Sequence, residues 1–364
     1  MKNKMYNSEK EKEKAIIVAV SINRSKVDFD RELEELESLC FTAGLEVVGQ
    51  TYQNIKEETA STLLGTGKVE EIGSMVKELG ADVVVVDCEL TGSQMSNIAD
   101  VVNAKVIDRS MLILDIFAKR ATSSEGRLQV KLAQLKYSLP RVASLTRAQG
   151  RFGGGVGMRG PGETKLEMDK RVIKDNIVKL EREIAKLKSN RQLQKNERRK
   201  NRVKQVAIVG YTNAGKSTLM NTITKAGIYA DDLLFATLDT TSRTLWLGEN
   251  KKVVLVDTVG FIDKLPHAFI QAFNATLEET KDADLLLHVV DIADPHCKEK
   301  IDVVNGVLKE IGANNIPTIM VYNKIDKLSG PFEVPSEAIC LSAKNNKGVE
   351  NLKNEIEKRL FDNE

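Results

Sequence analysis

The feature that most constrains the fold is a glycine-rich motif between a strand and a helix. Residues 210–217 read GYTNAGKS and match the pattern GxxxxGK[ST]. The apolar segment 205–210 before them predicts a buried strand, and residues 218–226 after them predict a helix. Backbone N–H groups of such a loop, at the positive end of a helix, wrap phosphate groups. The motif, called the P-loop below, predicts a nucleoside triphosphate site in a doubly wound α/β domain.

Three further motifs follow in the order expected of one guanine-nucleotide domain. A strand ends in DTVG at 257–260, another ends in NKID at 323–326, and LSAK stands at 341–344. A carboxylate at Asp326 can accept hydrogen bonds from the N1–H and exocyclic amine of guanine, whereas adenine lacks this donor pair. Asn323 can also bond the guanine edge, and Lys324 can stack over the base. A backbone amide of 342–344 can meet the guanine O6, so the set predicts GTP as the substrate.

The same motifs predict how the phosphates and Mg²⁺ are held. Lys216 neutralises β- and γ-phosphate oxygens, Ser217 offers its hydroxyl to Mg²⁺, and Asp257 holds Mg²⁺ through water. The Gly260 amide can sense the γ-phosphate. A threonine must also close over Mg²⁺ and the γ-phosphate; the candidates are Thr237, Thr240 and Thr241, and Thr237 is favoured. The predicted catalytic residues are Lys216, Thr237 and Gly260, and the predicted Mg²⁺ ligands are Ser217, Thr237 and Asp257.

The predicted nucleotide-binding residues lie in the four motifs. They are Gly210, Tyr211, Thr212, Asn213, Ala214, Gly215, Lys216, Ser217, Thr218, Asp257, Thr258, Val259, Gly260, Asn323, Lys324, Asp326, Ser342, Ala343 and Lys344. Asn213 is also a candidate ligand for K⁺, as in potassium-activated GTPases; the alternative is that it only stabilises the turn. Phe261 occupies the position where Ras-like enzymes carry a water-orienting glutamine. We therefore expect slow basal hydrolysis.

The N-terminal part has the alternating pattern of a second α/β domain. Expected strands cover 15–20, 45–52, 81–87 and 104–108, and expected helices cover 30–44, 69–80 and 93–102. This alternation predicts a small parallel sheet. Asp87, Glu89 and Asp108 end strands without nucleophile or metal partners, so we interpret them as helix caps and solvated loop residues.

Two leucine- and isoleucine-rich seams, at 128–139 and 173–187, flank a glycine-rich loop and predict an antiparallel helical hairpin. Residues 151–204 hold 17 Lys and Arg against 7 Asp and Glu, a net +10, whereas the whole chain carries +2. This concentration favours a polyanionic partner, with a solvated helix face as the alternative. The loop is either a linker or a segment whose cationic side chains and glycine backbone approach another surface.

The sequence divides the chain into four predicted parts. They are a charged tail (1–14), an α/β domain (15–108), a helical hairpin (109–202) with its loop at 150–162, and a GTP-binding domain (203–364).

The remaining composition excludes several classes of protein. Four cysteines without a CxxC pair argue against a disulfide framework and a structural zinc site. Apolar runs reach about six residues, far below the roughly 20 needed to span a bilayer. Three scattered histidines indicate no metal cluster, and His288 is expected in a strand core, as is Trp246. The sequence predicts a cytoplasmic protein with no membrane insertion, expected to be a monomer.

The quoted motifs resemble those of a known family. Residues 159–171 (RGPGETKLEMDKR), 210–221 (GYTNAGKSTLMN), 235–243 (FATLDTTSR) and 63–72 (LLGTGKVEEI) are similar to the HflX family of ribosome-associated GTPases. The resemblance runs from about residue 15 to the end. It implies a Mg²⁺-dependent GTP hydrolase that binds GTP and GDP and engages the rRNA of the large ribosomal subunit through the hairpin and the loop at 150–162. It also implies that stalled or idle ribosomes are split or rescued, under stress.

Departures and alternatives stay open at this point. Many family members carry a further C-terminal domain, whereas only 349–360 follows the LSAK motif as a helix here. Some members are reported to hydrolyse ATP in the N-terminal domain, but GTGK at 65–68 is no Walker motif. The alternative functions are a switch that recruits a protein effector, a ribosome-biogenesis GTPase, and an RNA-modifying or RNA-unwinding enzyme. The basic hairpin favours an RNA partner over the effector switch.

Overall fold

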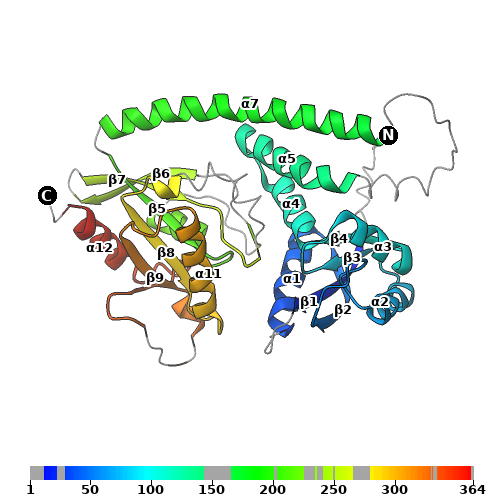
Figure 1. Ribbon diagram of the computed structural model, residues 1–364. Helices are drawn as coiled ribbons and strands as arrows, with labels where there is room; N and C mark the ends of the chain where they lie inside the picture. Colours follow the sequence, from blue (N-terminus) through cyan, green and yellow to red (C-terminus); the bar gives the residue numbers. More distant parts are fainter. Residues whose placement is uncertain are drawn as a thin grey trace, which may run out of the picture. The chain divides into compact units, whose positions relative to one another are not determined.

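Two parallel-stranded sheets organise the chain in the computed structural model (Figure 1). The structure describes residues 12–22, 29–142, 165–200, 203–224, 234–235, 241–248, 251–264, 279–328, 330 and 334–361. The chain divides into one unit of residues 1–116 and 136–174 and another of 117–135 and 175–364. None of the helices in the described ranges has the length and apolarity needed to cross a bilayer.

The first unit holds a four-stranded parallel sheet with the order β2-β1-β3-β4. Its strands are β1 (Lys14–Ile22), β2 (Glu46–Ile55), β3 (Val83–Val86) and β4 (Lys105–Asp108). Residues 15–21 of β1 are all buried, as expected for a central parallel strand that is covered on both faces. The four strands predicted from the sequence are confirmed, with small shifts at their ends.

Three helices cover this first sheet. They are α1 (Phe29–Ala43), α2 (Thr66–Leu79) and α3 (Gly92–Val102), and α1 lies on the opposite side of the sheet from α2 and α3 (Figure 1). Gly80 and Asn103 end α2 and α3 in the left-handed conformation, with φ of 62° and 54°. Glycine and asparagine adopt this conformation at low cost, which explains why the helices stop there. The three predicted helices are confirmed.

The predicted hairpin region is helical on both sides of the glycine-rich loop. It contains α4 (Arg109–Arg120), α5 (Ser124–Ser138), the short 3-10 helix η1 (Leu139–Arg141) and α7 (Lys165–Lys200). Pro140 stands at the start of η1, where the regular helix of α5 has ended. The loop at 150–162 lies outside the described residues, and the antiparallel pairing of the two helical arms stays a prediction.

The second unit holds a six-stranded sheet with the order β10-β9-β8-β5-β7-β6. Its strands are β5 (Lys204–Gly210), β6 (Thr241–Gly248), β7 (Lys251–Asp257), β8 (Leu285–Asp291), β9 (Thr318–Asn323) and β10 (Ile339–Cys340). The pairs along the sheet are parallel except for β6, which runs antiparallel to β7 at the edge. This doubly wound arrangement confirms the predicted fold class.

Helices α8 (Lys216–Thr224) and α12 (Val349–Phe361) share one apolar core with this sheet, while α11 (Cys297–Glu310) packs against β8 and β5. A short 3-10 helix, η2 (Ile325–Lys327), follows β9. Trp246 lies on the edge strand β6 with 61% of its surface exposed, so the predicted core position is wrong. Its neighbours Leu245 and Leu247 face the core instead, because alternate residues of a strand point to opposite faces.

His288 is a buried titratable group in the central strand β8, as predicted. It is 1% exposed, and its Nδ1 has no hydrogen-bond partner among the residues that the structure describes. Burial, and then the positive charge of Lys216, lower the pKa of His288 from 6.5 to about 4. The neutral imidazole is therefore the form that the folded sheet accommodates.

This burial predicts an acid-sensitive second unit. The unfolded chain binds the histidine proton at pH 6.5 and the folded chain only near pH 4, so stability should fall as the pH drops through this window. The pKa difference corresponds to about 3 kcal/mol in the free energy of unfolding. Urea unfolding followed by Trp246 fluorescence at pH 7 and pH 4.5 measures this loss. His288→Leu should lose less stability than wild type on acidification, whereas the control His296→Gln should behave as wild type; equal losses in all three proteins would contradict the assignment.

Candidate nucleotide-binding site

The P-loop connects β5 to α8 at the carboxyl edge of the second sheet, where doubly wound folds bind ligands. Gly210 has φ of 154° and Gly215 has φ of 92°, in the region that side chains rarely adopt. A Cβ at Gly210 would overlap the carbonyl oxygen of Val289, and one at Gly215 would overlap Nδ2 of Asn323. Gly210 is thus required by the close approach of the β8 backbone, and Gly215 by the Asn323 side chain at the end of β9.

Lys216 places a buried positive charge under the loop. The residue is 6% exposed, and its ammonium donates to the carbonyl oxygens of Gly210 at 3.1 Å and Tyr211 at 2.8 Å. Burial lowers the pKa of Lys216 to about 8, and nearby Lys324 adds to the shift while Asp257 opposes it. A buried ammonium held by neutral carbonyls would gain strongly from an anionic partner, as the predicted triphosphate contact requires.

Thr212 adds an unsatisfied donor to the same loop. Its side-chain oxygen is buried and has no hydrogen-bond partner within the described ranges. A buried hydroxyl without a partner costs free energy, so such a group points to a ligand that completes it. A phosphate oxygen would be a suitable acceptor.

The predicted Mg²⁺ ligands Ser217 and Asp257 lie together. The Ser217 hydroxyl donates to Oδ2 of Asp257 at 2.8 Å. Hydroxyl and carboxylate oxygens are hard ligands, so this pair fits the predicted ion. Among the candidate threonines, Thr241 is paired with Asp257 across β6 and β7, and its hydroxyl donates to the sulfur of Met220 at 3.6 Å. Thr237 and Thr240 lie outside the described residues, so Thr237 stays a prediction.

The segment 258–263 leaves β7 and runs along the P-loop. The Thr258 hydroxyl donates to the carbonyl of Ile208 in β5 at 2.7 Å, and the Val259 side chain is buried. A Cβ at Gly260 would lie 2.9 Å from the Lys216 ammonium and from Cα of Thr212. The backbone of Gly260 therefore approaches the predicted phosphate contact closely. Phe261 is 3% exposed and offers no polar atom to a water molecule from its side chain.

Asn323 connects three loops of the site. Its Nδ2 donates to the carbonyl of Ala214 at 2.9 Å, and its Oδ1 accepts from the N–H of Ala343 at 3.0 Å. Sequence reasoning assigned this side chain to the guanine edge alone and missed its role as a bridge between loops. A guanine O6 near Ala343 would share that N–H with Asn323, or would bind the N–H of Lys344.

Lys324 also contacts the P-loop. Its ammonium donates to the carbonyl of Asn213 and pairs with Oδ2 of Asp291, both at 2.7 Å. Asp291 ends β8 and was missed by sequence reasoning, although a polar residue at the end of a predicted buried strand was a usable signal. Asn213 itself is exposed and has φ of 60°, a left-handed conformation that asparagine adopts more readily than most residues. The backbone conformation of the turn is therefore one reason for an asparagine at this position.

The predicted base-recognising carboxylate lies at the open side of the site. Asp326 is exposed, and a hydrogen bond from the Ser342 hydroxyl lowers its pKa. Ser342 is itself 1% exposed and also accepts from the N–H of Asn345 at 3.2 Å. The carboxylate is thus ionised, oriented and accessible, which is what recognition of the two guanine donors requires.

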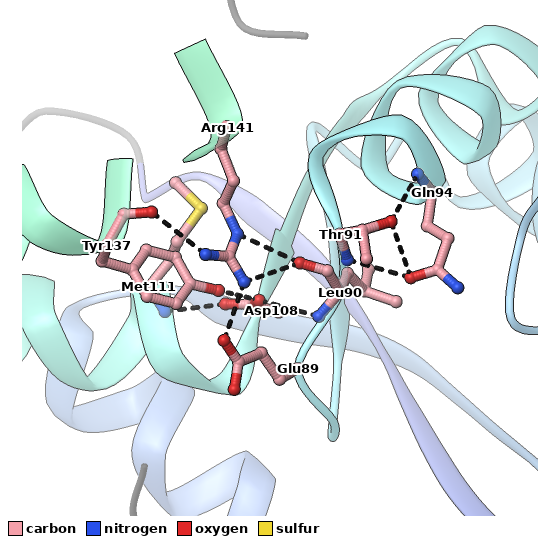
Figure 2. A network of polar contacts seen from close by, with 8 residues as sticks. All are labelled: Glu89, Leu90, Thr91, Gln94, Asp108, Met111, Tyr137 and Arg141. Carbon is pink, nitrogen blue, oxygen red and sulfur yellow. Dashed lines mark hydrogen bonds and ion pairs between the residues drawn. The ribbon is translucent and has the colours of Figure 1, made fainter. Parts of the chain in front are cut away.

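The acidic strand ends of the first unit form a separate network (Figure 2). Asp108 is fully buried and accepts from the Tyr137 hydroxyl, from the N–H of Leu90 at 3.0 Å and from the N–H of Met111 at 2.8 Å. Burial raises the pKa of Asp108. Arg141 donates to the Leu90 carbonyl and to Glu89, with its guanidinium 3.6 Å from the centre of the Tyr137 ring.

Asp87 is likewise fully buried and pairs with Arg109, which also pairs with Glu35. The interpretation of Asp87 and Asp108 as solvated residues is therefore wrong. The interpretation of Asp108 as a helix cap is correct, because its carboxylate accepts from the N–H of Met111 in the first turn of α4. These carboxylates are structural partners of the first unit's own arginines and tyrosine. Among the residues that the structure describes, no group of three or more His, Cys, Asp or Glu side chains is arranged to hold a metal ion.

Three family descriptions match successive segments of the chain. Residues 30–118 match the family described as GTP-binding GTPase N-terminal, and residues 120–198 match the GTP-binding GTPase middle region. Residues 205–324 match the family described as 50S ribosome-binding GTPase. Together the three matches span residues 30–324 with short gaps between them.

Two relatives and one solved structure illustrate the similarity. The chain is 50% identical over 352 residues to GTPase HflX of Caldanaerobacter subterraneus subsp. tengcongensis, covering 97% of this chain and 82% of the relative. It is 43% identical over 355 residues to GTPase HflX of Escherichia coli K12, covering 96% of this chain and 83% of the relative. A crystal structure of SsGBP in a GDP complex is 25% identical with a TM-score of 0.51, covering 95% of this chain and 98% of that one.

The exposed carboxylate of Asp326 predicts the base preference of the site. Asp326→Asn should weaken GDP binding by about 5- to 150-fold, since each unpaired guanine donor costs about 1–3 kcal/mol. The variant should gain preference for xanthine nucleotides, whose C2 oxo group replaces the amine. Titration with fluorescent guanine, xanthine and adenine nucleotides measures both effects. Asp302→Asn, at an exposed carboxylate of α11, is the control; wild-type affinity for ATP equal to that for GTP would contradict the assignment.

Proposed function

The chain belongs to the HflX family of GTPases, and on this basis we propose that it uses GTP binding and hydrolysis to split or rescue stalled or idle ribosomes. The observation that supports the proposal most strongly is the near full-length identity of 50% to a GTPase HflX. The match of residues 205–324 to a 50S ribosome-binding GTPase family favours the large subunit as the partner. GTP and GDP are the nucleotides that this family binds.

The proposed hydrolytic site uses the residues already described. Lys216 and the N–H groups of 213–218 would hold the phosphates, and the Gly260 amide would contact the γ-phosphate. Ser217 and Asp257, with Thr237, would hold Mg²⁺, which when bound neutralises charge on the phosphate oxygens. Asp326 would read guanine, with Asn323, Lys324 and the loop 342–344 shaping the base pocket.

The difference between bound GTP and bound GDP would affect ribosome binding through the segments that contact the γ-phosphate. Bound GTP would fix the chain around Thr237 and the segment 258–263, and hydrolysis would release both. The net +10 of residues 151–204 supports contact with rRNA phosphates. The glycine-rich loop at 150–162 contains none of the four nucleotide motifs, so we assign it to the step on the ribosome.

Slow basal hydrolysis is part of the proposal, because Phe261 cannot orient the attacking water. Asn213 supports K⁺ as one source of the missing charge stabilisation, since its exposed side chain stands in the P-loop beside the predicted phosphate contacts. A cation at this position would offset charge that develops in the transition state.

The potassium role can be separated from the backbone role of Asn213. Asn213→Gly keeps a residue that adopts φ of 60° and removes the amide oxygen. If the oxygen holds K⁺, wild type should hydrolyse GTP about tenfold faster in K⁺ than in Na⁺, a difference of about 1.4 kcal/mol in the barrier. The glycine variant should lose this difference but retain GDP affinity. Equal wild-type rates in the two cations, with and without ribosomes, would end the proposal.

Ribosome engagement should depend on nucleotide and on salt. Sedimentation with purified large subunits should show binding with a GTP analogue and weaker binding with GDP, and affinity should fall steeply with salt as counterions are released from rRNA. Deletion of Gly153–Gly157 should leave GDP affinity nearly unchanged while it impairs ribosome-stimulated hydrolysis or subunit splitting. A deletion variant with full activity on ribosomes would show that the loop is a passive linker. Wild-type protein that ignores large subunits in every nucleotide state would favour the effector-recruiting switch.

A further inference from the structure

Tyr211 stands out among the P-loop residues because its contacts lead away from the phosphates. It follows Gly210 at the end of β5 and is 5% exposed. Its hydroxyl accepts from the N–H of Asp263 at 2.9 Å. The sequence placed Tyr211 in the nucleotide-binding set, but this hydrogen bond joins its side chain to the end of the segment 258–263.

The backbone around Tyr211 joins the same segment. Thr212 donates its N–H to the carbonyl of Phe261 at 2.7 Å, and Phe261 donates its N–H to the carbonyl of Gly210 at 3.1 Å. Tyr211 and Phe261 thus form an isolated parallel bridge that continues the β5–β7 pairing beyond both strands. The Tyr211 hydroxyl adds a third bond, two residues further along.

These bonds enclose Gly260 between fixed points. On one side the Thr258 hydroxyl binds Ile208 of β5, and on the other side Phe261 and Asp263 bind the P-loop. Between them Gly260 lies so close to Lys216 and Thr212 that a Cβ would lie 2.9 Å from each. The position of the Gly260 N–H relative to a phosphate on Lys216 therefore depends on how firmly the segment is held.

The ring of Tyr211 is itself oriented from α11. The Lys300 ammonium lies 5.0 Å from the ring centre, within the range of a cation–π interaction, and it also pairs with Asp294. The tyrosine thus receives a positive charge on its face and an N–H at its hydroxyl. Both contacts restrict the ring, so the hydroxyl is a fixed acceptor.

We propose that Tyr211 is a positioning residue that holds the segment 258–263 against the P-loop and thereby places the Gly260 amide for the γ-phosphate of GTP. The inference rests on the proposed role of Gly260 and is independent of the ribosome. GDP lacks the γ-phosphate, so its affinity does not depend on this contact. Loss of the hydroxyl should therefore affect GTP hydrolysis and leave GDP binding unchanged.

Tyr211→Phe in the full-length chain, assayed without ribosomes, tests the proposal. We expect kcat for GTP to fall about three- to tenfold, the loss typical of one hydrogen bond. The Kd for GDP should stay within about twofold of wild type. The Kd for a non-hydrolysable GTP analogue should rise by less than kcat falls, because the free energy of one hydrogen bond is divided between GTP binding and the chemical step. Tyr322→Phe, at a half-buried tyrosine of β9 in the same unit, is the matched control and should behave as wild type.

A second variant guards against a general loss of folding. Lys300→Met removes the charge over the ring and retains the hydroxyl, so it should lower kcat by a smaller factor than Tyr211→Phe. The double variant should lower kcat by less than the product of the two single factors, because both residues act on the same ring. Wild-type kcat in Tyr211→Phe would overturn the proposal. Equal losses of GDP and GTP-analogue affinity would also overturn it, because they would place Tyr211 in the phosphate cradle. Ribosome sedimentation, tested separately, has no bearing on either outcome.

Discussion

The site depends on the two hydrogen bonds of the Asn323 amide. This side chain, at the end of β9, binds the P-loop through the carbonyl of Ala214 and the loop 341–344 through the N–H of Ala343. This bridge needs Gly215, because a Cβ there would occupy the space of the Asn323 nitrogen. The contact thus requires both residue types, a glycine in the P-loop and an asparagine at the end of β9, and it joins these two motifs and the loop 341–344 in space.

Two buried polar groups of the P-loop, the Lys216 ammonium and the Thr212 hydroxyl, are in an unfavourable environment that a bound triphosphate would improve. The Lys216 ammonium donates to the neutral carbonyl oxygens of Gly210 and Tyr211, and burial lowers its pKa to about 8. The Thr212 hydroxyl is buried without a partner in the described part of the chain. Both features cost folding free energy, and an anion that binds between them would recover it. Both groups belong to the P-loop, whereas Asp326, the predicted base-recognising carboxylate, is exposed and has a lowered pKa.

The sequence predicted the fold well, because the alternation of apolar strands and helices is clear and each nucleotide motif lies at the end of a strand, as its sequence context indicated. It did not predict the partners of those residues. Asp291, Lys300 and Asp294 support the site from segments without a recognised motif, and their contacts depend on tertiary packing. The burial of Asp87 and Asp108 was missed for the same reason. Asp87 pairs with Arg109 and Asp108 accepts from Tyr137, and both partners are more than 20 residues away in the sequence. The exposure of Trp246 was missed because an edge strand cannot be recognised from one strand alone.

Two lysine–aspartate pairs join the end of β8 to opposite sides of the P-loop. Asp291 holds Lys324 against the Asn213 carbonyl, and Asp294 holds Lys300 over the Tyr211 ring. The two acids are three residues apart, and their own turn is fixed by bonds from Ala293 to Asp291 and from His296 to Asp294. This one turn therefore positions two lysines that contact the P-loop, one at the backbone of Asn213 and the other at the ring of Tyr211.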